Sequence, residues 1–360
     1  MSINKKTTGI VSAVLVSSAL LSGCGLFGGE EKKQIDPPNE VSYTEDGSQS
    51  VVTEETTGTE VVDQEKAAEQ SVMTELYLID KEGYVVPQSF SLPNTVGVAK
   101  QALEYLVENG PLAETDMLPN GFRAVLPADT TVSVDIKDKV ATVNFSEEFK
   151  TYKAEDEARI LEAVTWTLTQ FDTIDKVKLK MNGHELTEMP VNGTPISDVV
   201  SRSNGINLDT TEVVDISNTM PLTVYYLGGD EKNYYYVPVT KRVSNKTKDP
   251  VVAVVNELVK GPSYKSNLVS EFLPEVKLLD APKVEAGKVT LNFNESVYGS
   301  FEEKMITKHL LTSLVLSLTE QQGIESVAVM VEGKSDVVSE DGEKIIEPVT
   351  RPEKVNTGSF

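Results

Sequence analysis

The chain of 360 residues is strongly acidic, with 56 Asp and Glu against 33 Lys and Arg and a formal net charge of −23 at pH 7. Nucleic acid is therefore not expected as a partner, because its binding rests mainly on Lys and Arg that meet phosphates. Hydrophobic residues make up 39% of the chain, which is enough for buried cores. The length that remains after the terminal segments suggests about two folded domains.

The first 23 residues have the organisation of a secretory signal peptide. Lys5 and Lys6 precede an apolar segment at 9–21, and small residues lead to Cys24. The apolar segment is too short to cross a bilayer as a lone helix, which needs about 20 residues. The sequence Leu-Ser-Gly-Cys resembles a bacterial lipobox, which implies cleavage before Cys24, a diacylglyceryl group on its sulfur, and a mature chain at the outer face of the cell membrane. The alternative is an ordinary secretory peptide with an incidental cysteine.

Cys24 is the only cysteine, so no disulfide can form within the chain. Residues 24–72 are rich in Gly, Glu, Ser and Thr and poor in aromatic residues. Such a composition cannot bury enough apolar surface to offset the entropy lost on ordering. We therefore expect an acidic, flexible tether that ends where the first folded domain begins.

The rest of the chain contains an internal repeat with an offset of about 150 residues. The two copies share Leu-Val and Gly-Pro at a helix end, a Leu-Pro pair, an Asn-Phe-x-Glu strand, and an Ile-x-x-Val…Gly closing strand. These matches keep their order and spacing. They define module 1 at 73–194, a linker at 195–218, and module 2 at 219–337. The tail at 338–360 is charged, and we expect it to be loose.

Both modules predict the same order of elements: a strand, a second short strand, a helix, a strand pair, a longer helix and a final strand. Asn94 and Asp249 are the expected N-caps of the first helices, and the longer helices cover 160–171 and 310–318. This order predicts an α+β fold in which two helices pack on one face of a small mixed, mainly antiparallel sheet in each module. The expected strands are 75–80, 84–90, 132–136, 140–145 and 177–181, and 222–227, 234–239, 276–279, 289–293 and 327–331.

The lipobox and the doubled module resemble the sporulation and germination lipoproteins whose paired modules are called GerMN domains. The repeated motifs carry this resemblance over residues 74–194 and 221–337. It implies a fold related to the ring-building motifs of secretion-system and sporulation-channel proteins, which associate edge to edge or act as adaptors. It also implies a non-enzymatic role in spore formation and germination, between the mother-cell and forespore membranes and beside the channel proteins. It carries over no catalytic residue and no cofactor.

Candidate chemistry in the chain is sparse. His184 and His309 occupy different places in the two modules and have no local catalytic arrangement, so we predict no catalytic residue and no metal site. A pair of catalytic carboxylates is the more specific alternative, because glycan hydrolysis uses two carboxyl groups. Glu147 and Glu295 are shared by both modules; the further candidates are Asp135, Glu148 and Glu185. A protein that binds or processes peptidoglycan or spore cortex is therefore the alternative function.

Two sets of polar residues are candidates for partner contacts. Asn144 and Asn292 recur in the shared Asn-Phe strands, where each either faces solvent, closes a turn by a hydrogen bond, or contacts a partner. A basic run at 241–248 is expected in the loop before the first helix of module 2, where it is either solvated or faces an acidic partner or phospholipid headgroups. The candidate contact residues are Lys241, Arg242, Lys246, Lys248, Asn144 and Asn292.

Overall fold

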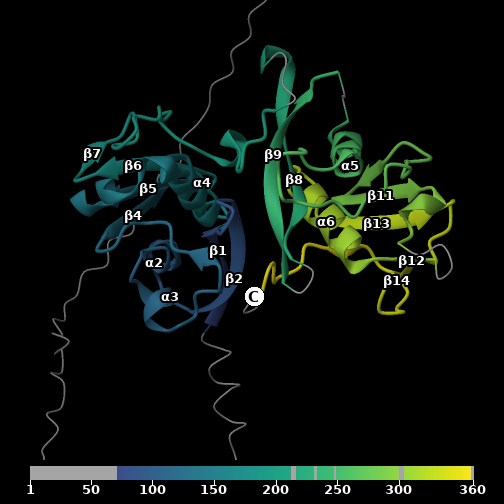
Figure 1. The fold of residues 1–360 in the computed structure, drawn as a ribbon, viewed down its shortest axis with the longest axis horizontal. Helices are drawn as coiled ribbons and strands as arrows, with labels where there is room; N and C mark the ends of the chain where they lie inside the picture. The colour runs from purple at the N-terminus through teal and green to yellow at the C-terminus, as the bar shows by residue number, and fades with distance from the viewer. Residues whose placement is uncertain (1–70, 212–215, 231–232, 247–248, 300–303, 358–360) are drawn as a thin grey trace, which may run out of the picture. The chain divides into compact units, whose positions relative to one another are not determined.

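The computed structural model describes residues 71–211, 216–230, 233–246, 249–299 and 304–357. The predicted signal peptide, Cys24 and nearly all of the predicted tether lie outside the described residues. Within the described ranges, no helix has both the length and the apolar character needed to cross a bilayer. These ranges form two modules with the same order of elements (Figure 1).

Module 1 combines a hairpin sheet with a second, mixed sheet. The hairpin consists of β1 (Ser71–Asp80) and β2 (Val85–Pro93), with the short β3 (Phe122–Arg123) paired to β1. The mixed sheet has the order β4-β5-β6-β7, in which β5 and β6 run parallel and the other pairs antiparallel. Its strands are β4 (Val132–Lys137), β5 (Val140–Phe145), β6 (Lys176–Met181) and β7 (His184–Glu185), and the α-helices are α2 (Val98–Tyr105), α3 (Pro111–Glu114) and α4 (Glu157–Leu168).

Module 2 repeats this plan with a longer hairpin. The strands β8 (Thr219–Gly229) and β9 (Tyr234–Ser244) pair antiparallel, and a mixed sheet has the order β10-β11-β13-β15. A short parallel pair joins β12 (Met305–Ile306) to β14 (Val338–Ser339). The mixed sheet contains β10 (Lys283–Glu285), β11 (Lys288–Phe293), β13 (Ser326–Val331) and β15 (Val349–Thr350), and the helices are α5 (Pro250–Lys260) and α6 (Lys308–Thr319).

The longer helix of each module links its two sheets into one core. Helix α4 contacts β1 and β6, and α6 contacts β8 and β13. Most residues of the apolar stripes predicted for these helices are buried, whereas Leu161, Phe171 and Leu311 are partly exposed at the margins of the core. Phe145 and Phe293 end the equivalent strands β5 and β11 and are both fully buried. The predicted α+β fold with two like modules is therefore confirmed.

Several local predictions need correction. The hairpins form sheets of their own instead of extending the mixed sheets. Helix α2 begins at Val98 after Gly97, so Asn94 is not its N-cap, whereas Asp249 does cap α5 by accepting hydrogen bonds from the first-turn amides. The strand predicted at 276–279 is reduced to a single antiparallel bridge between Leu278 and Phe293, and Lys283–Glu285 forms the strand that pairs with the start of β11.

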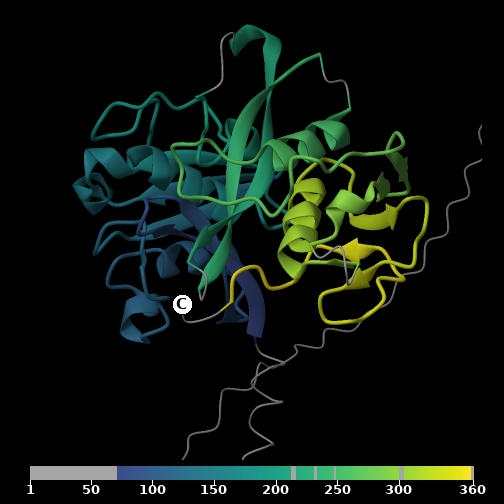
Figure 2. The ribbon, with the colours of Figure 1, turned by 45° about the vertical axis from the view of Figure 1, so that its right-hand side comes forward.

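The expectation of a loose C-terminal tail is wrong. Strand β15 pairs antiparallel with β13, and Val355 beyond it is buried. In Figure 2 the yellow C-terminal segment leaves the α6 module and runs to the β1–β2 hairpin of module 1. The linker between the modules is also structured. Ile206 is fully buried, and Val200 forms an antiparallel bridge with Val177 of β6.

Candidate functional site

The two repeated asparagines serve a turn, which is one of the interpretations that the sequence left open. The Oδ1 atom of Asn144 accepts from the amide of Gly183 at 2.7 Å, and that of Asn292 accepts from the amide of Gly333 at 2.9 Å. Both glycines have positive φ angles, in the tight turns that follow β6 and β13. Each asparagine thus supports a neighbouring turn in its own module.

The basic run does not form the exposed loop that the sequence suggested. Lys241 and Arg242 lie in β9; the side chain of Lys241 is only 5% exposed, and its Nζ lies 3.0 Å from a carboxylate oxygen of Glu257 on α5. Arg242 donates to Thr219 on the paired strand. Lys246 is exposed, and Lys248 lies outside the described residues. The assignment of Lys241 as an accessible partner contact is therefore wrong.

The structure does not gather the remaining candidates into a reactive cluster. His184 is exposed on β7, whereas the ring of His309 packs edge-on against Tyr234 with centroids 3.9 Å apart. Glu147 forms an ion pair with Lys150 in module 1, and Glu295 forms one with Lys304 in module 2. Within the described part of the chain, no group of three or more His, Cys, Asp or Glu could hold a metal ion.

The most elaborate polar structure lies where the modules meet, and the sequence reading missed it. Two segments, arm 1 (residues 202–209) and arm 2 (residues 351–357), follow the mixed sheets of modules 1 and 2. They share an Arg-x-x-x-Ile/Val-Asn pattern, in which Arg351 and Asn356 follow Arg202 and Asn207 by 149 residues. This second, shorter repeat was the available signal.

Each arm ends in an asparagine that joins β2 to β9. The side chain of Asn207 accepts from the amide of Val85 at 2.8 Å and donates to the carbonyls of Val85 and Pro238 at 2.8 and 2.7 Å. Asn356 accepts from the amide of Tyr236 at 2.8 Å and donates to the carbonyls of Tyr236 and Pro87 at 2.9 and 2.8 Å. The same three hydrogen bonds are made twice, with the modules exchanged.

The residue before each asparagine docks on the opposite module. The amide of Ile206 in arm 1 donates to the hydroxyl of Thr240 on β9 at 2.9 Å. The amide of Val355 in arm 2 donates to the hydroxyl of Ser89 on β2 at 2.9 Å. Because each arm crosses to the other module, the two modules cannot separate without breaking both sets of contacts.

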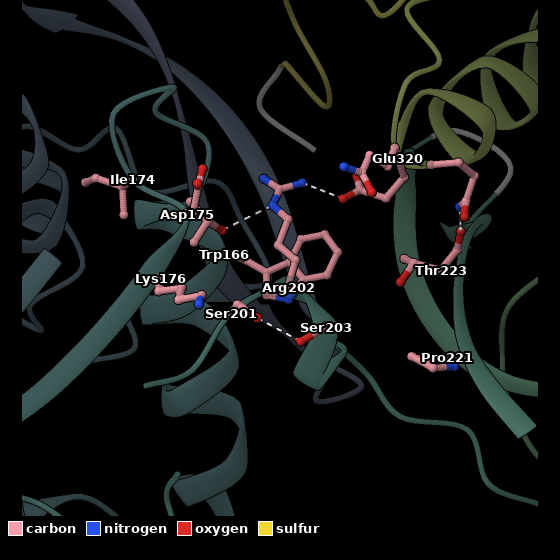
Figure 3. A pocket seen from close by; sticks show the side chains of 13 residues that line it. Trp166, Ile174, Asp175, Lys176, Ser201, Arg202, Ser203, Pro221, Thr223 and Glu320 are labelled. Atoms are coloured by element: carbon pink, nitrogen blue, oxygen red, sulfur yellow. Dashed lines mark hydrogen bonds and ion pairs between the residues drawn. The ribbon is translucent and has the colours of Figure 1, made fainter. Parts of the chain in front are cut away.

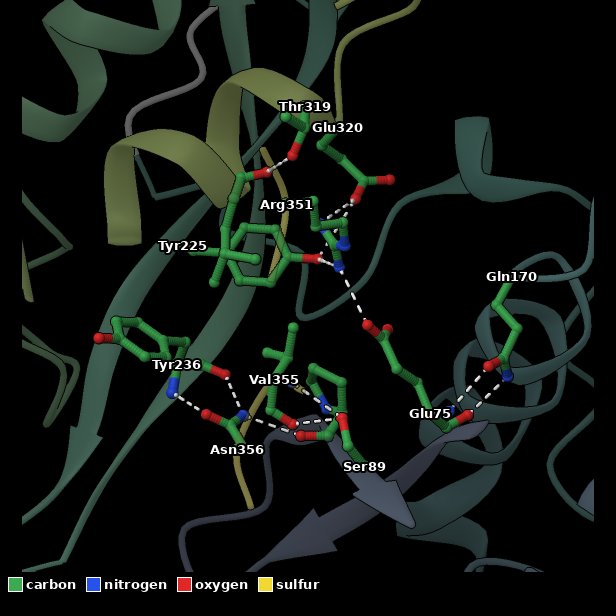
Figure 4. A network of polar contacts seen from close by, with 12 residues as sticks. Glu75, Ser89, Gln170, Tyr225, Tyr236, Thr319, Glu320, Arg351, Val355 and Asn356 are labelled. Carbon is green, nitrogen blue, oxygen red and sulfur yellow. Dashed lines mark hydrogen bonds and ion pairs between the residues drawn. The ribbon is translucent and has the colours of Figure 1, made fainter. Parts of the chain in front are cut away.

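A buried ionic network extends from the arms (Figure 4). Arg202 donates to Glu320 at 2.6 Å, and Arg351 lies 3.6 Å from the other oxygen of Glu320 and 3.5 Å from Glu75. Burial alone would raise the pKa of Glu320, but the two guanidinium groups hold it below its usual value. Tyr225 adds a hydrogen bond to Glu320 at 3.2 Å. The network joins α6 and β8 of module 2 to β1 of module 1.

Beside this network, the structure has an open cleft of about 770 Å³ between the modules, lined by polar and apolar groups in similar measure (Figure 3). Arg202 spans it, with its guanidinium 4.4 Å from the centre of the Trp166 ring and its Nε donating to Thr169 at 3.1 Å. Ser201 and Ser203 come from the linker side, whereas Thr223 and Glu320 face them from module 2. The cleft contains donors and acceptors of both modules.

Two similar α+β modules joined by exchanged arms define a tandem-repeat protein. Residues 75–187 and 223–337 each match the Germane family, which is described as sporulation and spore germination. The chain therefore belongs to the Germane family, with two GerMN modules in tandem.

Close relatives agree with this assignment. The chain is 56% identical over 366 residues to spore germination protein GerM of Bacillus subtilis (strain 168), covering 99% of this chain and 100% of the relative. The solved tandem GerMN domains of the sporulation protein GerM from Bacillus subtilis match with a TM-score of 0.76 and 60% identity, covering 80% of this chain and 100% of that one. The family description refers to a developmental process and names no reaction.

Proposed function

We propose that this member of the family is a lipid-anchored, non-enzymatic assembly module that works between the mother-cell and forespore membranes. A lipid on Cys24 holds the chain at the membrane, and residues 24–72 carry the paired modules away from the surface. The net charge of −23 supports this arrangement, because anionic headgroups repel the folded part. The proposed partners are envelope proteins of a sporulation channel complex.

The observation that carries the assembly role is an open sheet edge repeated in both modules. Strand β4 ends one mixed sheet and β10 ends the other, and no further strand pairs with either among the described residues. Each edge presents an apolar side chain at the equivalent position, with Ile136 44% and Val284 52% exposed. Such edges accept a strand from another protein through main-chain hydrogen bonds. The edges thus suit either channel proteins or further copies of the chain.

The contacts between the modules, with the exchanged arms among them, hold the β4 and β10 edges in fixed positions relative to each other. The Tyr235 hydroxyl of β9 donates to Asp80 of β1 at 2.7 Å, and the Tyr235 ring packs edge-on against Phe122 of module 1. Burial and this hydrogen bond raise the pKa of Tyr235, so the phenol stays protonated as a donor at physiological pH. A pair of edges held in this way can join two envelope components at a set separation, as an adaptor requires.

The test replaces the exposed apolar residue of each edge by a charge. Ile136→Lys with Val284→Lys should leave the fold intact and greatly reduce the capture of envelope proteins by crosslinking in sporulating cells, with a matching loss of spores. Val96→Lys with Ile346→Lys is the matched control, because both side chains are exposed away from these edges. If the edge variant captures the same partners and sporulates as the control does, the proposed assembly role through these edges is wrong.

A further inference from the structure

The cleft between the modules has a second half that mirrors the first. A neighbouring space of about 590 Å³ shares Arg202 and Glu320 with the cleft and is lined by Gln170, Asp172, Arg351 and Glu353. Thr169 and Arg202 of the first half correspond in the repeat to Thr319 and Arg351 of the second. The two spaces therefore adjoin at Thr169, Arg202 and Glu320, on both sides of the ionic network, and together they are called the groove.

The groove offers many hydrogen-bonding groups and little net charge in its larger half. There Lys176 and Arg202 balance Asp175 and Glu320, and hydroxyl and amide side chains complete the lining. The Nε and Nη1 atoms of Arg202 have partners, whereas its Nη2 has none among the described residues. A guanidinium fixed on an aromatic ring with a free edge is preorganised to donate to oxygen atoms of a ligand.

The lining argues against other ligand classes. The strand edges that face the groove are already covered, because Gln170 bonds both the amide and the carbonyl of Glu75, and Ser317 accepts from the amide of Tyr225. A peptide therefore finds no free edge on which to add a strand. The large apolar side chains of the lining, Trp166 and Ile174, are both buried, so they offer an amphipathic helix little exposed apolar surface. Anionic polymers would meet the acidic side chains of the second half.

We propose that this groove binds an uncharged, polyhydroxylated polymer, namely a glycan strand of the cell wall or spore cortex. Hydroxyl and acetamido groups both donate and accept hydrogen bonds, which matches a lining of guanidinium, amide, hydroxyl and carboxylate groups. Repeating sugar units match the two similar halves. Glycan binding uses the junction and leaves the β4 and β10 edges free, so it is a separate activity from protein assembly.

The test uses the chain without its first 58 residues, because the described residues that remain belong to one compact unit, and purified peptidoglycan sacculi as the probe. We expect the protein to sediment with sacculi and to bind soluble oligomers of N-acetylglucosamine, which are uncharged and carry the same hydroxyl and acetamido groups. Lys176→Ala with Gln322→Ala removes two exposed side chains from opposite walls of the groove and should weaken binding about tenfold. Lys137→Ala with Gln101→Ala, outside the groove, is the matched control and should bind as the unmodified protein does.

The outcomes separate the alternatives. Binding to sacculi and to N-acetylglucosamine oligomers that falls in the groove variant alone supports the proposal. The absence of binding to sacculi, equal binding by groove and control variants, or binding to stem peptides without glycan would each overturn it. Thermal unfolding of every variant confirms that a lost interaction does not reflect a lost fold. Capture of envelope proteins by the β4 and β10 edges is measured separately, so failure here leaves the assembly role untouched.

Discussion

Asn207 and Asn356 make the same contacts from the two exchanged arms, and each joins β2 to β9 by three side-chain hydrogen bonds. Both have positive φ angles, of 47° and 56°, which asparagine tolerates better than most residues. The junction between the modules therefore depends on a pair of residues that local sequence patterns do not distinguish.

Replacing either asparagine by alanine should lower the free energy of unfolding by about 2–4 kcal/mol, because buried backbone groups lose their partners and alanine disfavours a positive φ. Denaturation in urea measures the loss. Asn182→Ala is the matched control, because Asn182 also has a positive φ, of 49°, in the turn after β6. Equal losses at Asn182 and Asn207 would show that backbone strain, and not the junction, accounts for the effect.

The stability of the junction should also depend on pH through Glu162. Its carboxylate on α4 accepts from the amide of Asn207 at 3.1 Å, and burial raises its pKa to about 7, although that hydrogen bond and Arg159 act in the opposite direction. Because the folded state binds this proton more tightly than the unfolded state, stability should fall as pH rises from about 4.5 to about 7, by up to about 3 kcal/mol. Carboxylates whose pKa is lowered in the folded state, such as Glu157 at about 2, change the stability only at pH values below this range.

Glu162→Gln should remove this dependence and stabilise the protein at pH 8. The measurement is urea denaturation at pH 5 and pH 8, compared with the exposed Glu155→Gln on the preceding turn. If both variants lose stability equally between the two pH values, Glu162 is not the titrating group.

The repeat, the long helices and the central strands of the mixed sheets could be predicted because each leaves a periodic pattern in the sequence, whereas the parallel pairing of these strands could not. Strand β10 was misplaced because turn geometry, and not alternation, sets its register. Ala286 and Gly287 both have positive φ, so they form a two-residue turn that brings Glu285 opposite Lys288. Residues 277–279 meet only the far end of β11, where Leu278 forms a single antiparallel bridge with Phe293, so they do not make up a strand of their own.

The exchanged arms could not be predicted from local pattern. Their shared positions are only an arginine, an aliphatic residue and an asparagine within six residues, which is too short for any helical or strand period. Their partners lie far along the chain, such as Ser89 for Val355. Lys241 was misread for the same reason, since its partner Glu257 comes from a helix that follows in the sequence.

Lys241→Ser should destabilise the protein by about 3–5 kcal/mol, because it leaves Glu257 without its nearest cation in a mostly buried site. Lys246→Ser, at an exposed position of the same run, should change the free energy of unfolding by less than about 0.5 kcal/mol. Thermal and urea unfolding measure both effects. A Lys241 variant as stable as the Lys246 variant would restore the earlier interpretation of the run as a solvated surface.

Membrane attachment should depend on Cys24 alone. Cys24→Ala removes the sulfur that carries the lipid, and the acidic folded part has no attraction to anionic headgroups that would replace it. We expect the variant to leave the membrane fraction and to take up no radiolabelled fatty acid. Ser17→Ala, inside the apolar segment, keeps the lipobox and should remain attached. If the Cys24 variant still fractionates with membranes, and the native protein takes up no label, then the segment is an ordinary signal peptide or an anchor of another kind, and the tethered arrangement must be abandoned.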